Sequence, residues 1–253
     1  MSSTNHPVDT YAVRNVPLTR PFIWLSEGWA DLMHHRAASL AYGVLVALLG
    51  VLIFAYSRHP FYLAAVSAAF LLVGPILTAG CCELSRLQDA AQAAGFEDSL
   101  RPLSRNRQAL LGVAQTLALL ALAWFALSAG LYFGLVGSPA PSLASTVGGD
   151  VLRQLSANQL FAYGVVGLVL AGAVFTLSVV TVPMIVDRHV DAATAMRMSL
   201  RVTLRDLPVM LVWALLIALL VAAGFATGLI GMIVIFPLLA HATWRAYTEL
   251  VEH

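Results

Sequence analysis

Three pairs of ionisable side chains stand near the ends of predicted membrane-spanning helices, where they could carry protons or bind a ligand. They are Glu83 with Arg86, His241 with Arg245, and Asp187 with Arg188. The first two pairs are spaced by three and four residues, so each shares one helical face. Charges at such positions commonly reach toward water and pair with one another, and the alternative is a proton or ligand path. The sequence leaves both interpretations open.

His241 is the most informative of these residues because of its predicted depth. It lies four residues after Pro237 and three before Trp244, a residue type that favours the headgroup level of a membrane. Pro237 removes one backbone donor and frees a carbonyl one turn earlier. A neutral imidazole donates one hydrogen bond and accepts another, so it suits such a place. We predict that His241 faces the interior of the helical bundle, serving either structure or proton transfer.

The remaining candidates, Gln115 and the two cysteines, are expected to contribute to helix packing and not to catalysis or metal binding. Gln115 is a polar side chain within an otherwise apolar span, where an interhelical hydrogen bond is its expected role. The adjacent Cys81 and Cys82 are poorly placed for a mutual disulfide, and a soft-metal site would need further ligands at coordination spacing. We expect both to be small packing residues.

Known catalytic signatures are absent from the chain. It contains no G-x-S-x-G, Walker or H-E-x-x-H motif, and only His241 among the histidines lies within a predicted span, which disfavours haem ligation. We therefore predict a protein that is not an enzyme and has no catalytic residue, cofactor or metal site.

The elements that must position these side chains are membrane helices. Hydrophobic residues make up 60% of the 253 residues and charged residues 11%, against about 25% charged in a soluble domain. We predict an all-α polytopic bundle of six transmembrane helices, arranged as three hairpins. Residues 1–20 are expected to form a flexible cytoplasmic tail, and residues 21–253 a single integral membrane domain. The predicted spans are residues 37–56, 61–82, 109–136, 161–186, 208–226 and 229–247.

Amphipathic helices are expected to lie in the membrane interface between some of these spans. Arg197, Arg201 and Arg205 are spaced by four, so they share one face, with Leu200 and Leu204 among the residues on the other side. Such a helix directs its guanidinium groups to lipid headgroups. Residues 22–33 show a similar apolar periodicity. The predicted headgroup-facing residues are Arg197, Arg201, Arg205, Arg101 and Arg105.

The distribution of arginine predicts the orientation in the membrane. The chain has no lysine, and the six-span arrangement places 12 of the 14 arginines on one side and only Arg58 and Arg153 on the other. Basic residues favour the cytoplasmic side, so both termini are predicted to be cytoplasmic. The net charge of +1 hides this asymmetry and gives no indication of nucleic-acid binding.

A weak internal repeat accompanies this arrangement. Ser99-Leu100-Arg101 matches Ser199-Leu200-Arg201 at an offset of 100, and the first interfacial helix matches at an offset of 171. Each unit would consist of an interfacial helix, a span, a reversal and a proline-bearing span. Three-fold duplication and coincidence among Arg-rich and Leu-rich segments both account for the pattern.

Several short segments resemble an uncharacterised bacterial family of integral membrane proteins, classed as a domain of unknown function. The segments are Trp29 with Asp31, Ser39-Leu40-Ala41-Tyr42-Gly43, Val73-Gly74-Pro75, Glu83-Leu84-Ser85-Arg86 and His241-Ala242-Thr243-Trp244. The resemblance covers roughly residues 21–252 and implies a multi-pass protein of the bacterial cytoplasmic (inner) membrane. The C-terminal module, residues 191–253, is also similar to the membrane domain of some glycerophosphodiester phosphodiesterases, although no phosphodiesterase domain is present. The family has no established activity, so the resemblance adds no mechanism.

These observations predict a non-enzymatic helper or scaffold subunit. Its partners would be the lipid bilayer together with another membrane protein or a second copy of the chain, and not nucleic acid. The alternative is a small transporter or channel for a solute or lipid, in which proline-bent helices line a path.

Overall fold

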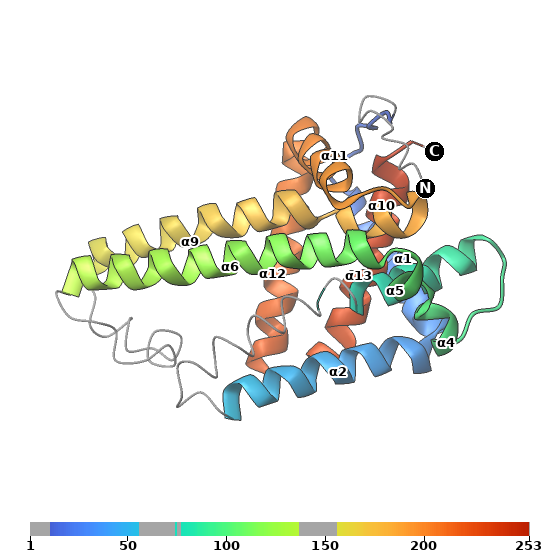
Figure 1. The fold of residues 1–253 in the computed structure, drawn as a ribbon, viewed down its shortest axis with the longest axis horizontal. Coiled ribbons are helices and arrows are strands. Elements are labelled where there is room, and N and C mark those ends of the chain that lie inside the picture. The colour runs from blue at the N-terminus through green and yellow to red at the C-terminus, as the bar shows by residue number, and fades with distance from the viewer. Residues whose placement is uncertain (1–10, 56–73, 75–76, 137–155, 253) are drawn as a thin grey trace.

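The fold is all-helical throughout the part of the chain that the structure describes. This computed structural model describes residues 11–55, 74, 77–136 and 156–252, and Figure 1 shows their arrangement. Residues 77–89 are also helical. The other helices are α1 (Arg20–His34), α2 (Arg36–Ala55), α4 (Phe96–Ser99), α5 (Arg101–Arg105), α6 (Arg107–Val136), α9 (Ala157–Ser178), α10 (Thr181–Arg188), α11 (Ala192–Arg205), α12 (Leu207–Ala226) and α13 (Met232–Leu250).

Helix α13 is the central element, because it packs against α1, α2, α10 and α12. Two glycines allow the closest approaches. A Cβ atom on Gly28 of α1 would lie 2.6 Å from the backbone nitrogen of Ala242, and one on Gly43 of α2 would collide with the backbone of Ile233. Side chains larger than hydrogen therefore cannot occupy these crossings without moving α13.

A recurring break joins a short helix to a long apolar helix at three places. The single break residues are His35, Asn106 and Asp206, with φ/ψ of −110/42°, −116/22° and −123/51°. At each break the backbone nitrogen donates to the carbonyl four residues earlier, and the break residue's own carbonyl accepts from the amide four residues later. The three residues are separated by the offsets of 100 and 171 at which the sequence repeat was recognised. The backbone thus repeats in the register of the sequence.

The two ends of the described chain are joined. Val13 forms an isolated antiparallel bridge with Val251, the Arg14 amide donates to the Leu250 carbonyl at 3.0 Å, and the Glu252 amide donates to the Ala12 carbonyl at 3.0 Å. The prediction of a flexible tail is therefore wrong for residues 11–19, since its sequence signal was only a lack of apolar periodicity. Residues 1–10 lie outside the described residues.

Several predicted spans agree with observed helices, and three differ in their boundaries. The predicted span 229–247 is observed as α13, Met232–Leu250, which begins and ends three residues later. Helices α2, α6 and α12 match three predicted spans closely, and the predicted turn at Gly228 has φ +63°. The predicted span 161–186 is interrupted at residues 179–180, where the Val180 amide approaches the Ser199 hydroxyl at 3.4 Å. The helix predicted to end at residue 82 continues to 89, because its polar side chains find partners inside the bundle. Residues 61–73 lie outside the described residues.

Two segments of the described chain are long and apolar enough to cross a membrane, Ala171–Arg188 and Leu207–Ala226. A third candidate is the pair α1 and α2, whose axes are bent by 106° at His35. The first of these segments runs across the break between α9 and α10. These segments support an integral membrane protein. The described residues contain two or three candidate spans, whereas six were predicted.

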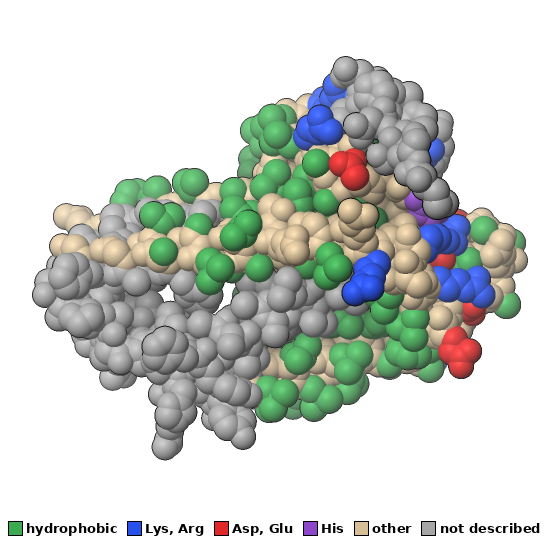
Figure 2. All heavy atoms as spheres, viewed as in Figure 1, with side chains coloured by type: hydrophobic (Ala, Val, Ile, Leu, Met, Phe, Trp, Pro, Cys, Tyr) green, Lys and Arg blue, Asp and Glu red, His purple; other side chains and the backbone are tan. Residues whose placement is uncertain are grey.

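The surface divides into a polar end and an apolar arm. Figure 2 shows charged side chains gathered over the end that carries α1, α10 and α11, whereas the arm of α6 and α9 shows mainly hydrophobic side chains. Exposed leucines recur on α12 at every fourth residue, at Leu207, Leu211, Leu215 and Leu219. Such a stripe is the side of a helix that faces lipid or another apolar partner.

Candidate functional site: a buried polar network

His241 lies at the centre of a hydrogen-bond network inside the polar end. The side chain is fully buried on α13, and both ring nitrogens have serine partners. Nε2 lies 2.9 Å from the hydroxyl of Ser39 on α2, and Nδ1 lies 2.7 Å from the hydroxyl of Ser85 on helix 77–89. The Ser85 hydroxyl in turn donates to Oδ2 of Asp31 on α1 at 2.8 Å. The His241 imidazole and the Ser85 hydroxyl together therefore connect four helices.

The direction of these hydrogen bonds follows from the donor inventory. Ser85 has one hydroxyl proton, which it donates to the Asp31 carboxylate, so its oxygen accepts from His241. Nδ1 of His241 then carries the proton. In the neutral ring Nε2 accepts from the Ser39 hydroxyl. Donors consequently run in one direction, from Ser39 through His241 and Ser85 to Asp31.

Asp31 ends this chain of donors and is saturated. Arg245 forms a two-point ion pair with it, from Nε to Oδ2 at 2.8 Å and from a terminal nitrogen to Oδ1 at 2.6 Å. Gln88 adds a donor to Oδ1 at 3.2 Å. With Ser85, the carboxylate accepts four hydrogen bonds, about its full capacity. Since Asp31 is only 2% exposed, these bonds replace the water that it loses.

The network reaches the surface through Arg245. Its other terminal nitrogen donates to Oδ1 of Asp89 at 2.8 Å, and the indole of Trp244 donates to Oδ2 of the same carboxylate at 2.8 Å. The Asp89 side chain is 37% exposed. The Arg245 guanidinium therefore links the buried Asp31 carboxylate to the exposed Asp89 carboxylate. Helix α13 bonds to helix 77–89 at two places, Ser85 and Asp89.

Glu83 forms a second buried cluster on another side of helix 77–89. Its side chain is fully buried and accepts two hydrogen bonds from Arg86, at 2.7 and 2.8 Å. Arg105, from α5, adds a third at 3.2 Å and also donates to the Val186 carbonyl at 3.3 Å. Arg105 had been predicted to face lipid headgroups. It instead points toward this cluster, because a buried carboxylate with one arginine still has free lone pairs.

Asp187 belongs to a third cluster near the chain ends. It accepts a hydrogen bond from the Tyr247 hydroxyl at 2.7 Å and pairs with Arg188 at 2.9 Å. Arg188 also stacks over the ring of Tyr11, at 5.5 Å from the centroid. Two of the three pairs singled out in the sequence, Glu83 with Arg86 and Asp187 with Arg188, thus form ion pairs. His241 instead bonds to two serines, and Arg245 bonds to Asp31 and Asp89.

Other predicted residues lie apart from these clusters. The Gln115 side chain is exposed on α6. It is therefore not buried between helices, where the predicted interhelical hydrogen bond would form. On α11 the residues buried against the protein include Ala195, Met198 and Val202, while Leu200 and Leu204 are 39% and 65% exposed. Arg101 pairs with Asp98, and Arg197 bonds within its own helix. Arg205 is exposed and Arg201 is half-buried.

The two cysteines are free and fully buried. Cys82 makes a long contact of 3.9 Å from its sulfur to the Ala240 carbonyl, which is a packing contact. Within the described residues, no group of three or more His, Cys, Asp or Glu side chains is arranged to hold a metal ion.

The comparison with protein families matches the middle of the chain. Residues 62–187, just under half of the sequence, match the family described as "Predicted integral membrane protein (DUF2189)". This supports an uncharacterised family of integral membrane proteins. The match includes Ser85 and Glu83 but neither Asp31 nor His241. No curated protein and no solved structure matches the chain.

The residues that sequence reasoning missed are the acceptor and the two hydroxyls. Asp31, Ser39 and Ser85 were not identified as members of the network around His241, because side-chain pairing across 54 to 214 residues leaves no local pattern. A signal was nevertheless present. The short segments on which the family resemblance rested contain Asp31, Ser39, Ser85 and His241.

Proposed function

We propose that the protein is a non-enzymatic helper or scaffold subunit of the bacterial cytoplasmic membrane. In this proposal six spans form three hairpins, and both termini lie in the cytoplasm. The observation that carries it is the saturation of the buried network. Asp31 has four donors and both nitrogens of His241 have partners, so these polar groups bond to one another. Groups arranged this way fix helices in one geometry.

The apolar arm supplies the surface for a partner in this proposal. Leu168 of α9 and Leu119 of α6 are 74% and 67% exposed. In lipid such leucines alone give little preference for a partner, so shape complementarity along the arm would select one.

Co-purification after mild solubilisation tests the scaffold directly. A second membrane protein, or a second copy, should be recovered in constant ratio with the tagged chain. Leu168→Ser should reduce that ratio, whereas Leu211→Ser, on a leucine of α12 that is 60% exposed, should leave it unchanged. Recovery of the chain alone, with no second copy, contradicts the proposal.

A transporter is the second candidate, and one observation favours it. The hydroxyl, imidazole and carboxylate groups from Ser39 to Asp31 form a continuous chain of proton donors and acceptors at 2.7 to 2.9 Å. Flux of protons or of a solute panel into liposomes tests this function. If flux occurs and both His241→Leu and His241→Gln abolish it while leaving folding intact, the transporter replaces the scaffold.

Topology is tested by labelling from the periplasm. Tags at Met1 and His253 should be shielded, and a cysteine placed within residues 142–146 should react. Labelling of His253 from outside would contradict two spans between Pro208 and Tyr247. The similarity of this C-terminal module to the membrane domain of some glycerophosphodiester phosphodiesterases stays a prediction.

A further inference from the structure

The side of α11 that is turned away from the protein carries a row of leucines beside a row of arginines. Leu200 and Leu204 are spaced by four residues and are both exposed, and Arg197, Arg201 and Arg205 have the same spacing. Leu200 follows Arg197 by three residues, which places the two rows about 60° apart around the helix axis. Figure 2 shows hydrophobic and basic side chains next to one another over α11. The helix therefore has an amphipathic outer side in addition to the face that it buries.

The next helix, α12, sets the depth of α11 relative to a membrane. Leu207–Ala226 is a candidate span with a mean hydropathy of 2.7, and it begins directly after the break residue Asp206. Arg205 is two residues before Leu207, so it lies at the headgroup level when α12 crosses the bilayer. At that level leucines enter the acyl region while arginines extend toward phosphates. The position of α11 in the chain thus agrees with the pattern on its outer side.

The two exposed arginines of the row are not neutralised by an acidic side chain in the described structure. Arg197 bonds to a backbone carbonyl and a hydroxyl of its own helix, neither of which is charged. Among the described residues, Arg205 has no ion pair or hydrogen bond. The acidic residues at the two ends of α11 are Asp191 and Asp206, and neither forms an ion pair in the part of the chain that the structure describes. The row therefore attracts an anion from outside the protein.

Helix α5, which precedes the second break, shows the opposite arrangement. Arg101 forms an ion pair with Asp98, and Arg105 forms one with the buried Glu83. Both arginines were predicted to face headgroups, yet each already has a carboxylate of the protein. The structure therefore separates the arginines of α5 from those of α11.

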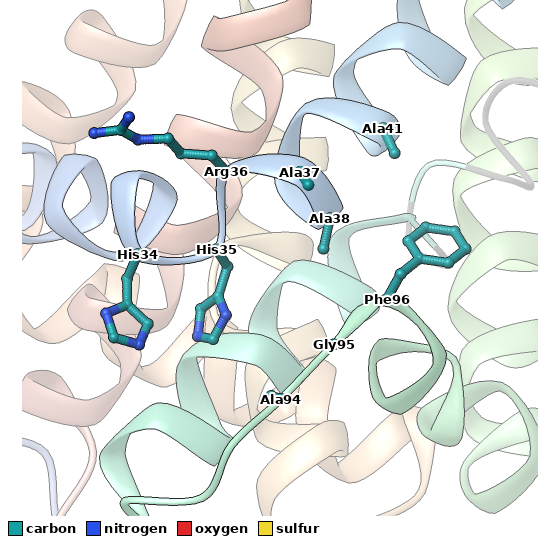
Figure 3. Close-up of a pocket in the computed structure, with 9 residues that line it drawn as sticks. All are labelled: His34, His35, Arg36, Ala37, Ala38, Ala41, Ala94, Gly95 and Phe96. Carbon is teal, nitrogen blue, oxygen red and sulfur yellow. The ribbon is translucent and has the colours of Figure 1, made fainter.

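Helix α1, which precedes the first break, also lacks a row of arginines. Its one arginine, Arg20, pairs with Glu249 at 2.6 Å. Arg36 follows this break as a single exposed arginine, and Figure 3 shows its side chain pointing away from the rings of His34 and His35. Of the three short helices that precede a break, α11 is thus the one that combines several arginines with exposed leucines.

We infer that the outer side of α11 binds the headgroup phosphates of anionic lipids through its arginine row, while Leu200 and Leu204 lie among the acyl chains. Successive arginines of the row are about 6 Å apart along the axis, at about 1.5 Å per residue, so the row can meet more than one phosphate. Basic residues at this level favour anionic over zwitterionic lipids. This selectivity is the same for a scaffold and for a transporter, because it depends on the membrane and not on a protein partner or a solute.

Lipid retention tests this selectivity. The full-length protein is reconstituted in nanodiscs that contain equal amounts of phosphatidylglycerol and phosphatidylcholine, released, and analysed by native mass spectrometry for retained lipids. The wild type should retain severalfold more phosphatidylglycerol than phosphatidylcholine. The enrichment should fall as sodium chloride is raised before release, because salt screens exposed charges. Equal retention of the two lipids overturns the inference, and it leaves the scaffold to be decided by co-purification.

Substitutions connect the enrichment to α11. The double variant Arg197→Gln/Arg205→Gln removes two exposed cations and should lower the enrichment severalfold, since each basic residue near an anionic surface favours it by about fivefold. The double variant Arg197→Lys/Arg205→Lys keeps the charge and should retain most of the enrichment. Arg101→Gln, on an exposed arginine that already pairs with Asp98, is the matched control and should behave like the wild type.

Three outcomes of these substitutions overturn the inference. They are an unchanged enrichment in the glutamine variant, an equal loss in the lysine variant, and an equal loss in Arg101→Gln. Leu204→Glu keeps the test decisive if the glutamine variant fails to fold. It places a negative charge beside the arginine row at a position that is 65% exposed, so it should also lower the enrichment. An enrichment equal to that of the wild type in Leu204→Glu contradicts the proposed site.

Discussion

The polar end and the apolar arm are both built from helices, but those helices are held together in different ways. At the polar end, α1, α2, helix 77–89 and α13 are joined by directional bonds around Asp31 and His241. Helices α6 and α9 pack side by side and expose leucines along their length. Because lipid solvates apolar side chains as well as a neighbouring helix does, apolar contact alone sets no unique geometry. The directional bonds therefore give the polar end a fixed geometry.

Breaking the ion pair at Asp31 should produce the largest effect. Asp31→Ala leaves the Arg245 guanidinium without its buried partner, which typically costs about 3–5 kcal/mol of unfolding free energy. Denaturant-induced unfolding in nanodiscs measures the loss. The matched control is Arg14→Ala, whose ion pair with Glu252 is exposed on both sides, and it should cost no more than about 1 kcal/mol. Equal losses would mean that the two ends of the molecule are not held differently.

Substitutions at His241 should have the next largest effect. His241→Leu leaves the hydroxyls of Ser39 and Ser85 without a ring partner, and each unsatisfied group costs about 1–3 kcal/mol. His241→Gln keeps a donor and an acceptor and should lose less stability. Unfolding of the two variants under identical conditions gives the comparison, and an equal loss in both would argue against hydrogen bonding as the function of the ring.

Acidification should weaken the second break through His189. Burial, and then the cations of Arg105 and Arg86, lower the pKa of His189, while Asp187 and Glu83 oppose them. A lowered folded-state pKa means that the unfolded chain binds the proton more readily, so the stability contribution is complete above the unfolded pKa, about 6.5, and is lost as pH falls below it. His189→Asn should therefore show a smaller drop in melting temperature between pH 7.5 and 5.5 than the wild type. An unchanged pH slope would contradict this assignment.

The smallest effect is expected on the arm. Gln115 is exposed on α6, so Gln115→Leu should change the unfolding free energy by no more than about 0.5 kcal/mol. A larger loss, measured in the same unfolding assay, would show that directional bonds matter on the arm as well, which would remove the contrast with the polar end.

Local patterns in the sequence predicted the helices well and the contacts among them poorly. Composition and periodicity located α2, α6 and α12, and glycine marked the turn at Gly228. The break between α9 and α10 was missed, because Ser199, which meets the Val180 amide, is on another helix. The exposed position of Gln115 was missed for the same reason. Which face of a helix meets a neighbour depends on packing that no local window contains.

The candidate site shows the same limit. The sequence pointed to His241 and its depth, but the acceptor lies 214 residues away from Arg245, on the first helix. The charge pairs Glu83–Arg86 and Asp187–Arg188 were visible because their members are close in the chain. Arg105, which joins Glu83 from 22 residues away, was assigned to the headgroups instead.

The central position of α13 has a consequence for biosynthesis. The first helices to leave the ribosome carry Asp31 and Ser39, yet the ion-pair partner of Asp31 and the imidazole partner of Ser39 are on the last helix, with 202 residues between Ser39 and His241. At about 5–20 residues per second, translation of that interval takes roughly 10–40 s. During this time the Asp31 carboxylate and the Ser39 hydroxyl lie in or near the membrane without their bonds to α13. The nascent chain therefore spends most of its synthesis as an incomplete bundle that is vulnerable to quality-control proteases, and the arrival of α13 completes assembly in a single late step.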